Sequence, residues 1–263
     1  MVISASNKGW VEVLARIGLG AKGILYILLG ILAFMAAFEI NGKSNEDADR
    51  NGVLLFLRDS EGGTILLAIL MAGLLCYSTW RTIEGFSIKP YSKKLWGKKL
   101  RYWASALTYL TVAFAAYKVL NYEQGGDGQH WSQKVFYQDY GRILLVIIAL
   151  IIAGNGFYQI WYGFSSKFKD HVSGADLGNS NAGFLLKSGK IGYTARGIVW
   201  LIIAFILIRA VLHANASEAG DTAKAFSFVE TSAYGSYLLG GLGLGLVAYG
   251  IFCLLRAGFE KFR

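Results

Sequence analysis

Six long apolar segments constrain what this chain can fold into more than any other feature of its sequence. Each has about 20 mostly apolar residues, the length that a helix needs to cross the hydrocarbon core of a bilayer. Of the 263 residues, 16% are charged, against about 25% in soluble domains. The sequence therefore predicts an all-α transmembrane protein, a six-helix bundle with approximate spans Ile17–Phe38, Gly63–Ile83, Leu100–Leu120, Gly141–Phe164, Ile191–Leu212 and Ala233–Leu255.

The distribution of charge orients these spans. Six spans place both termini on the same side. Lys and Arg are concentrated at the two termini and in the linkers after the second and fourth spans, whereas Asp and Glu are concentrated in the other three loops. The positive-inside rule then predicts cytoplasmic N- and C-termini. The basic stretch Lys89–Arg101 is expected to face anionic phospholipids of the cytoplasmic leaflet, and no nucleic-acid partner is expected.

The first helix of each pair carries an internal repeat. The segment Gly18-Leu-Gly-Ala-Lys-Gly-Ile-Leu-Tyr26 matches Gly192-Tyr-Thr-Ala-Arg-Gly-Ile-Val-Trp200 in its glycines, alanine, cation, isoleucine and final aromatic residue. A weaker middle copy, Ala104-Ser-Ala-Leu-Thr-Tyr109, has Ser105 in place of the cation. Repeats of this kind predict repeated supersecondary units. We predict one membrane domain over residues 1–263, with repeats at about 10–88, 96–168 and 186–263, all pointing the same way.

The second helices repeat as well. Gly63, Gly141 and Gly235 each begin a predicted helix that continues with a pair of leucines. An aspartate precedes each of these glycines at the same distance, and a short, partly apolar stretch follows each aspartate. We predict short interfacial helices on the outer membrane face, with the aspartates as N-caps. The alternative is a ring of carboxylates at an outer vestibule; the aspartates are Asp49, Asp127 and Asp221.

These motifs resemble a bacterial membrane family, the domain-of-unknown-function family numbered 1206. The Gly-Tyr-x-Ala-Arg-Gly segment at 192–197, its relative at 18–23 and the Gly-x-x-Leu-Leu pattern are similar to that family. The resemblance implies three tandem two-helix repeats and a multi-pass protein of the bacterial inner membrane. It implies no activity and no catalytic residues.

Lys22 and Arg196 are candidates for a functional contact because they occupy equivalent repeat positions. With predicted helices beginning at Ile17 and Ile191, both cations lie about one turn inside a helix N-terminus, where they oppose the helix dipole. The interpretation that we favour is that they snorkel to lipid phosphates. The alternative is a specific anionic lipid headgroup, or a carboxylate of a protein partner, held between repeats.

Polar residues of the second helices are expected to face the bundle interior. Asn155 and Gln159 lie in the fourth predicted span, and Tyr77 and Tyr249 hold the same repeat position as Asn155. Such side chains usually bond to another helix, so a packed polar interior is favoured over a small cavity. Small residues at four-residue spacing predict helix-packing faces at Ala68/Ala72, Ala149/Ala153 and Gly241/Gly245.

The sequence contains no pattern typical of a catalytic or metal site. Its three histidines lack the spacing of metal or haem ligands, so we expect no enzyme activity and no cofactor. The function remains unknown at this level, and two hypotheses compete. The first is a non-enzymatic membrane module that binds lipid or another membrane protein. The second is a channel or carrier for a small solute or ion along a pseudo-threefold axis.

Overall fold

The computed structural model describes residues 5–40, 49–88, 93–121, 135–165, 179–215, 222–231 and 234–260. Within these ranges all regular structure is helical, and six helices are long and apolar enough to cross a membrane. Two short helices, α2 and α8, lie between the long ones. The helices are α1 (Ala5–Ala37), α2 (Arg50–Arg58), α3 (Gly63–Ser87), α4 (Lys93–Leu120), α6 (Gly141–Phe164), α7 (Asn179–Leu212), α8 (Thr222–Glu230) and α9 (Gly235–Phe259). The predicted all-α transmembrane fold is confirmed.

Helices α1 and α7 begin much earlier than predicted, and this changes the setting of the two repeated cations. Because α1 begins at Ala5 and α7 at Asn179, Lys22 and Arg196 lie near the middle of their helices. The prediction that they sit beside a helix N-terminus is wrong, and the helix dipole therefore does not act on them. Hydropathy locates only the apolar part of each helix. Both helices begin with polar residues that precede that apolar part.

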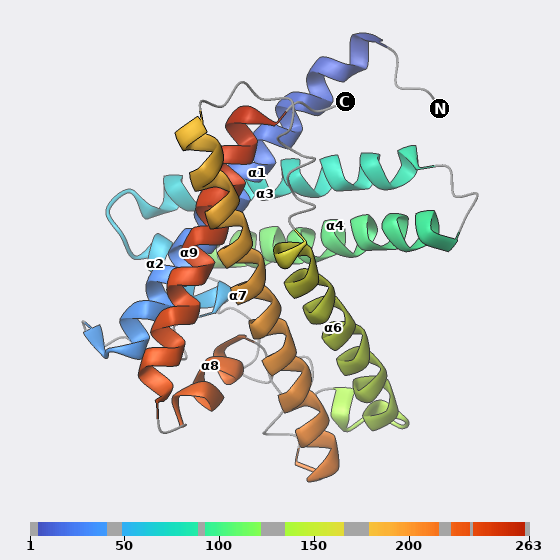
Figure 1. The fold of residues 1–263 in the computed structure, drawn as a ribbon, viewed down its shortest axis with the longest axis vertical. Helices are drawn as coiled ribbons and strands as arrows, with labels where there is room; N and C mark the ends of the chain where they lie inside the picture. Colours follow the sequence, from blue (N-terminus) through green and yellow to red (C-terminus); the bar gives the residue numbers. More distant parts are fainter. Residues whose placement is uncertain are drawn as a thin grey trace.

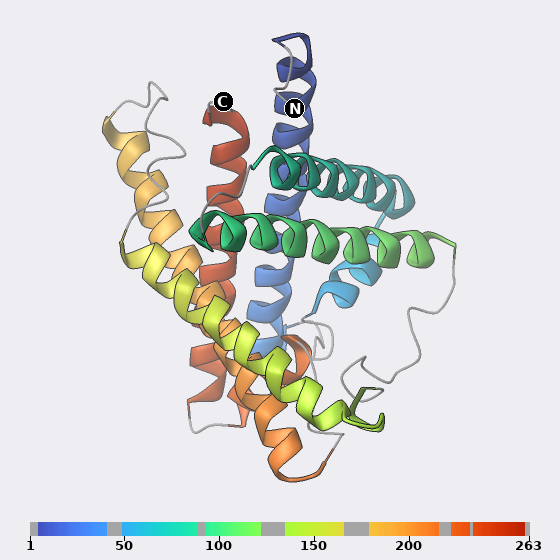
Figure 2. The same ribbon diagram turned by 90° about the vertical axis from the view of Figure 1, so that its right-hand side faces the viewer.

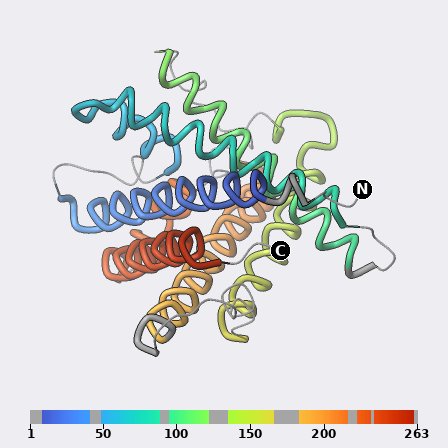
Figure 3. The backbone as a smooth tube through the Cα atoms, turned by 90° about the horizontal axis from the view of Figure 1, so that it is seen from above, coloured from blue at the N-terminus to red at the C-terminus, as the bar shows by residue number. Residues whose placement is uncertain are grey.

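The six long helices form three antiparallel pairs, and each pair joins two different repeats. Helix α3 packs along α4, α6 along α7, and α9 along α1. The last of these contacts joins the third repeat to the first, so the repeats close into a ring. In Figure 1 and Figure 2 the α3–α4 pair runs across α1 and α9 instead of alongside them. Figure 3, seen from above, shows α1 and α9 side by side.

Small residues at one repeat position bring the helices of each pair together. In two pairs, a Cβ on either glycine would come within about 3 Å of the carbonyl oxygen of the other. In the α3–α4 pair the equivalent residues are Ser78 and Ala106, and the Ser78 hydroxyl donates a 2.8 Å hydrogen bond to the Ala106 carbonyl. All three pairs therefore come together at the same repeat position. The glycine pairs are Gly23 with Gly250 and Gly197 with Gly156.

Within a repeat, the two long helices touch at a single close crossing in the first and third repeats. A Cβ at Gly18 would lie 2.5 Å from the Tyr77 Cα atom, and a Cβ at Gly192 would lie 2.5 Å from the Tyr249 Cα atom. In the second repeat, Arg101 stands where Gly18 and Gly192 stand. Its long side chain rules out the same approach, and α4 and α6 do not pack along each other within the described ranges. We call this opening the α4–α6 seam.

The short helix α2 packs one face against the long helices, and the Leu55 and Phe56 side chains of its other face are exposed, as predicted for a short amphipathic helix between two spans. Its residues Val53 and Leu54 are fully buried, and the helix packs against α1, α3 and α4. The Asp49 carboxylate accepts a 2.6 Å hydrogen bond from the Gly52 amide and is the N-cap of α2. Asp127 and Asp221 lie outside the described residues.

The predicted small-residue pairs face neighbouring helices only in part: Ala149 is fully buried, and a Cβ on Gly245 would collide with the Ala195 Cβ atom. Ala72 and Gly241 are exposed, and nothing lies within 4 Å of a Cβ built on Gly241. Four-residue spacing alone does not say which side of a helix faces a neighbour.

Candidate functional site

Lys22 of α1 is buried at the centre of the ring of helices. Only 4% of its surface is exposed, and its Nζ donates a 3.1 Å hydrogen bond to the Tyr77 hydroxyl. The ammonium also lies 4.8, 5.1 and 5.4 Å from the ring centroids of Tyr77, Tyr109 and Tyr249. At these distances each ring attracts a cation through its quadrupole. Lys22 therefore does not snorkel to lipid, and that interpretation is wrong for this residue.

Arg196 of α7 lies beside the same tyrosines. Its Nη1 donates a 2.6 Å hydrogen bond to the Tyr249 hydroxyl. Its guanidinium carbon lies 5.2 Å from the Tyr26 ring centroid and 4.9 Å from that of Tyr249. The Nε atom is buried and has no hydrogen-bond partner within the described ranges. A buried donor without an acceptor is costly, so this atom marks a place where the protein alone leaves a polar group unsatisfied.

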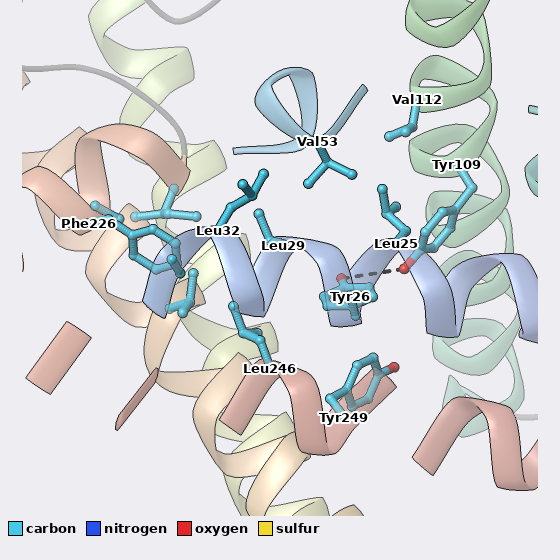
Figure 4. Close-up of a cluster of buried hydrophobic side chains, with 14 of the residues drawn as sticks. Leu25, Tyr26, Leu29, Leu32, Val53, Tyr109, Val112, Phe226, Leu246 and Tyr249 are labelled. Carbon is cyan, nitrogen blue, oxygen red and sulfur yellow. Dashed lines mark hydrogen bonds between the residues drawn. The ribbon is translucent and has the colours of Figure 1, made fainter. Parts of the chain in front are cut away.

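These residues form one cluster that draws on all three repeats. Tyr26 and Tyr109 hold the same repeat position, and their hydroxyl groups are 3.4 Å apart. Figure 4 shows Tyr26 of α1 between Tyr109 of α4 and Tyr249 of α9. We call the set the tyrosine–cation cluster; its members are Lys22, Arg196, Tyr26, Tyr77, Tyr109 and Tyr249.

Unlike two other cations of the bundle, the two cations of this cluster have no acidic partner among the described residues. Arg256 forms a salt bridge of 2.7 Å with Glu260, and Arg81 is paired with Glu84. In the described part of the chain, no Asp or Glu lies within ion-pair distance of Lys22 or Arg196. Their neighbours are tyrosine rings and hydroxyl groups, so no acidic side chain of the described ranges balances either cation.

A cavity of about 260 Å³ adjoins the cluster. Its lining includes Arg196, Tyr26 and Arg50, the first residue of α2. Among the described residues Arg50 also has no acidic partner within ion-pair distance. Thr108 of α4 and Ile152 of α6 complete the wall. The cavity thus reaches the two helices that bound the α4–α6 seam, and two guanidinium groups give it a positive lining.

The other predicted interior residues have different surroundings. Tyr77 and Tyr249 are each 1% exposed and belong to the cluster. Gln159 is 5% exposed, and its Oε1 atom has no hydrogen-bond partner among the described residues. Asn155 is half-buried on α6. Asn155 holds the repeat position of Tyr77 and Tyr249, which lie at the close crossings with Gly18 and Gly192. Within the described ranges, the two long helices of the second repeat make no such crossing.

A second set of repeated cations was not singled out from the sequence. Arg16 donates two 2.7 Å hydrogen bonds to the carbonyls of Ala257 and Gly258 at the C-terminal end of α9. Lys99 and Lys190 hold the equivalent repeat position. Their ammonium groups lie over Phe86 at the end of α3, at 6.0 Å, and over Phe164 at the end of α6, at 5.1 Å. Each cation therefore sits where it complements the dipole of the neighbouring repeat's second helix. Aligning all three copies beyond the Gly-x-x-Ala-cation motif reveals this position.

Comparison with known proteins places the chain in a family without an assigned activity. The sequence model described as Domain of Unknown Function (DUF1206) matches three segments, residues 17–87, 100–166 and 191–260. The uncharacterized protein YxxB of Bacillus subtilis (strain 168) is 24% identical over 264 residues, covering 98% of this chain and 94% of the relative. No solved structure matches the chain. The three matched segments correspond to three tandem repeats.

Proposed function

This chain belongs to the DUF1206 family, and we propose that it is a non-enzymatic membrane module that binds an anionic ligand at the tyrosine–cation cluster. The observation that supports this proposal best is the pair of cations, Lys22 and Arg196, that lack any acidic partner in the described part of the chain. An anion beside them would supply the missing charge and an acceptor for the unsatisfied Arg196 Nε.

Energetics favour a ligand over a purely structural role for these charges. Removing a cation from water costs several kcal/mol even in real proteins. Contacts with aromatic rings return about 0.5–2 kcal/mol, and a hydrogen bond from a charged group about 1.5–3 kcal/mol. Lys22 makes one such hydrogen bond and three ring contacts. For Lys22, the hydrogen bond and the ring contacts together roughly offset the free energy lost on removal from water. Arg196 still has one N–H group, at Nε, without an acceptor among the described residues. An oxyanion would accept that hydrogen bond.

We place the protein in the bacterial inner membrane with both termini in the cytoplasm. The excess of Lys and Arg at the termini and in the even-numbered linkers supports this orientation. Arg16, Lys99 and Lys190 contact the C-terminal ends of α9, α3 and α6, which the positive-inside rule assigns to the cytoplasmic side. Anionic phospholipids of the cytoplasmic leaflet are the expected partners of this side.

Permeation along the pseudo-threefold axis is less well supported. The centre of the ring is filled by side chains, among them Tyr77, Tyr109 and Tyr249, each about 1% exposed. A conduit needs a continuous polar path or a gate that can open. The cavity beside Arg196 is a local space bounded by α1, α2, α4 and α6–α9, which suits a bound molecule better than a stream of ions.

Native mass spectrometry of the detergent-extracted protein tests the proposal. The wild type should retain an anionic molecule, and Lys22→Met/Arg196→Met should lose it. Lys118→Met is the matched control, since Lys118 lies near the end of α4 beside Phe114 and outside the cluster. An anion-free wild-type spectrum, together with no binding of added anionic lipid or phosphate, would overturn the proposal.

A further inference from the structure

The α4–α6 seam is open because the second repeat departs from the other two at two positions. Arg101 replaces a glycine on the first helix of the repeat, and Ile151 replaces the glycine found at positions 73 and 245 on the second helix. In the other repeats that glycine packs directly against an alanine, Ala21 or Ala195. The equivalent alanine of the second repeat is Ala104.

Side chains along the seam have correspondingly different exposure. Ala21 and Ala195 are buried at 7% exposure, whereas Ala104 is exposed. Ile151 is 67% exposed. In a bilayer an apolar opening between two membrane-spanning helices meets lipid chains. The second repeat therefore has a gap at the place where the first and third repeats close.

The positively lined cavity touches both helices that bound this gap. Arg50 and Arg196 line it, and so do Thr108 and Ile152 from the two helices that bound the seam. At about 260 Å³ the cavity falls just below the roughly 300–1,000 Å³ typical of pockets that enclose a whole drug-sized ligand. It can hold a headgroup, but acyl chains would have to leave it.

We propose that the cavity holds the phosphate headgroup of an acidic phospholipid between Arg50 and Arg196, with the acyl chains leaving through the α4–α6 seam. This inference rests on the proposed function and names its ligand. Guanidinium groups bind phosphate oxygens with paired hydrogen bonds, and the unsatisfied Arg196 Nε supplies one donor. The apolar, exposed seam supplies the path for the chains. Free phosphate could bind the same guanidinium groups, but it has no acyl chains that would occupy the seam.

Measuring the binding of phosphatidylglycerol and of inorganic phosphate distinguishes a lipid headgroup from a free phosphate ion. The protein is delipidated and placed in phosphatidylcholine nanodiscs, and phosphatidylglycerol or inorganic phosphate is titrated while binding is followed by native mass spectrometry. Arg50→Gln should weaken the binding of both probes by roughly tenfold or more, because a charge-assisted hydrogen bond is lost. Ala104→Phe should weaken phosphatidylglycerol binding by a similar factor and leave phosphate binding unchanged.

Matched variants keep the result interpretable. Ala72→Phe places the same ring at an exposed alanine of α3, away from the seam, and should change neither affinity. Ile151→Trp narrows the seam from the opposite helix and should reproduce the effect of Ala104→Phe. Circular dichroism checks that each variant is folded.

The outcomes distinguish the two proposals. Phosphatidylglycerol binding that weakens in Arg50→Gln, Ala104→Phe and Ile151→Trp supports the lipid site. Phosphate binding without phosphatidylglycerol binding, or lipid binding that both seam variants leave intact, overturns the lipid site and spares the anion site. Binding of neither probe overturns both.

Discussion

Adding one methyl group at Gly18 should separate α1 from α3 and break the cluster at its buried lysine. A Cβ at this position would lie 2.5 Å from the Tyr77 Cα atom, where ordinary contacts begin at 3.4 Å. The two backbones must therefore move apart by roughly 1 Å. The 3.1 Å hydrogen bond from Lys22 to the Tyr77 hydroxyl would then exceed hydrogen-bonding distance.

The magnitude follows from these two losses. Overpacking costs about 1–3 kcal/mol, and a hydrogen bond from a charged group contributes about 1.5–3 kcal/mol. Gly18→Ala should therefore lower the free energy of unfolding by roughly 2–5 kcal/mol. Gly192→Ala should have a similar effect, since its Cβ would meet the backbone of Tyr249 at the same distances.

Reversible unfolding in mixed micelles, followed by circular dichroism, measures both variants. Arg101→Ala is the control, because this residue holds the same repeat position in the open seam. It loses a ring contact with Tyr158 at 4.9 Å and should change the free energy of unfolding by about 1 kcal/mol or less. If Gly18→Ala and Gly192→Ala lower the free energy of unfolding no more than Arg101→Ala does, the helices of the first and third repeats do not cross as closely as described.

Three further perturbations probe other parts of the structure by the same unfolding assay. Arg16→Ala removes the two hydrogen bonds to the α9 carbonyls and should destabilise the bundle by about 2–4 kcal/mol; no change would mean that this contact does not hold the ring closed. Asp49→Ala removes the N-cap of α2 and should cost about 1 kcal/mol, whereas the exposed Asp59→Ala should cost less than about 0.5 kcal/mol. Lys22→Met removes a charge whose hydrogen bond and ring contacts roughly offset its cost of burial, and it should change the free energy of unfolding of the ligand-free protein by about 1 kcal/mol or less; a loss of several kcal/mol would show that the ammonium and the tyrosines form a stabilising structural unit.

Hydropathy and repetition predicted the helices well where the chain is apolar along its whole length. Helix α6 has the predicted bounds Gly141–Phe164. Helix α1 begins earlier than predicted because residues such as Glu12 and Arg16, which pair across one helical turn, lower the hydropathy without ending the helix. The equivalence of Lys22 and Arg196 was visible in the sequence, but their depth depends on where their helices begin.

The composition of the cluster could not be predicted because it depends on how the ring closes. Tyr26 belongs to the first repeat, and it contacts Arg196 of the third because α1 and α9 pack through Gly23 and Gly250. No spacing within one repeat reveals that contact. The open seam did leave a signal in the sequence, since Arg101 and Ile151 replace glycines of the other copies. These two replacements indicate an open seam only once the structure shows that the equivalent glycines form the helix crossings.

A high-resolution experimental structure from a lipidic mesophase tests the central claim most directly, because it shows what lies beside Arg196. We predict density for an anionic headgroup within hydrogen-bonding distance of the Arg196 Nε atom and of the Arg50 guanidinium, continuing as chain density between α4 and α6. A cavity that holds only water, with Lys22 and Arg196 each beside a carboxylate of this chain, would contradict the account.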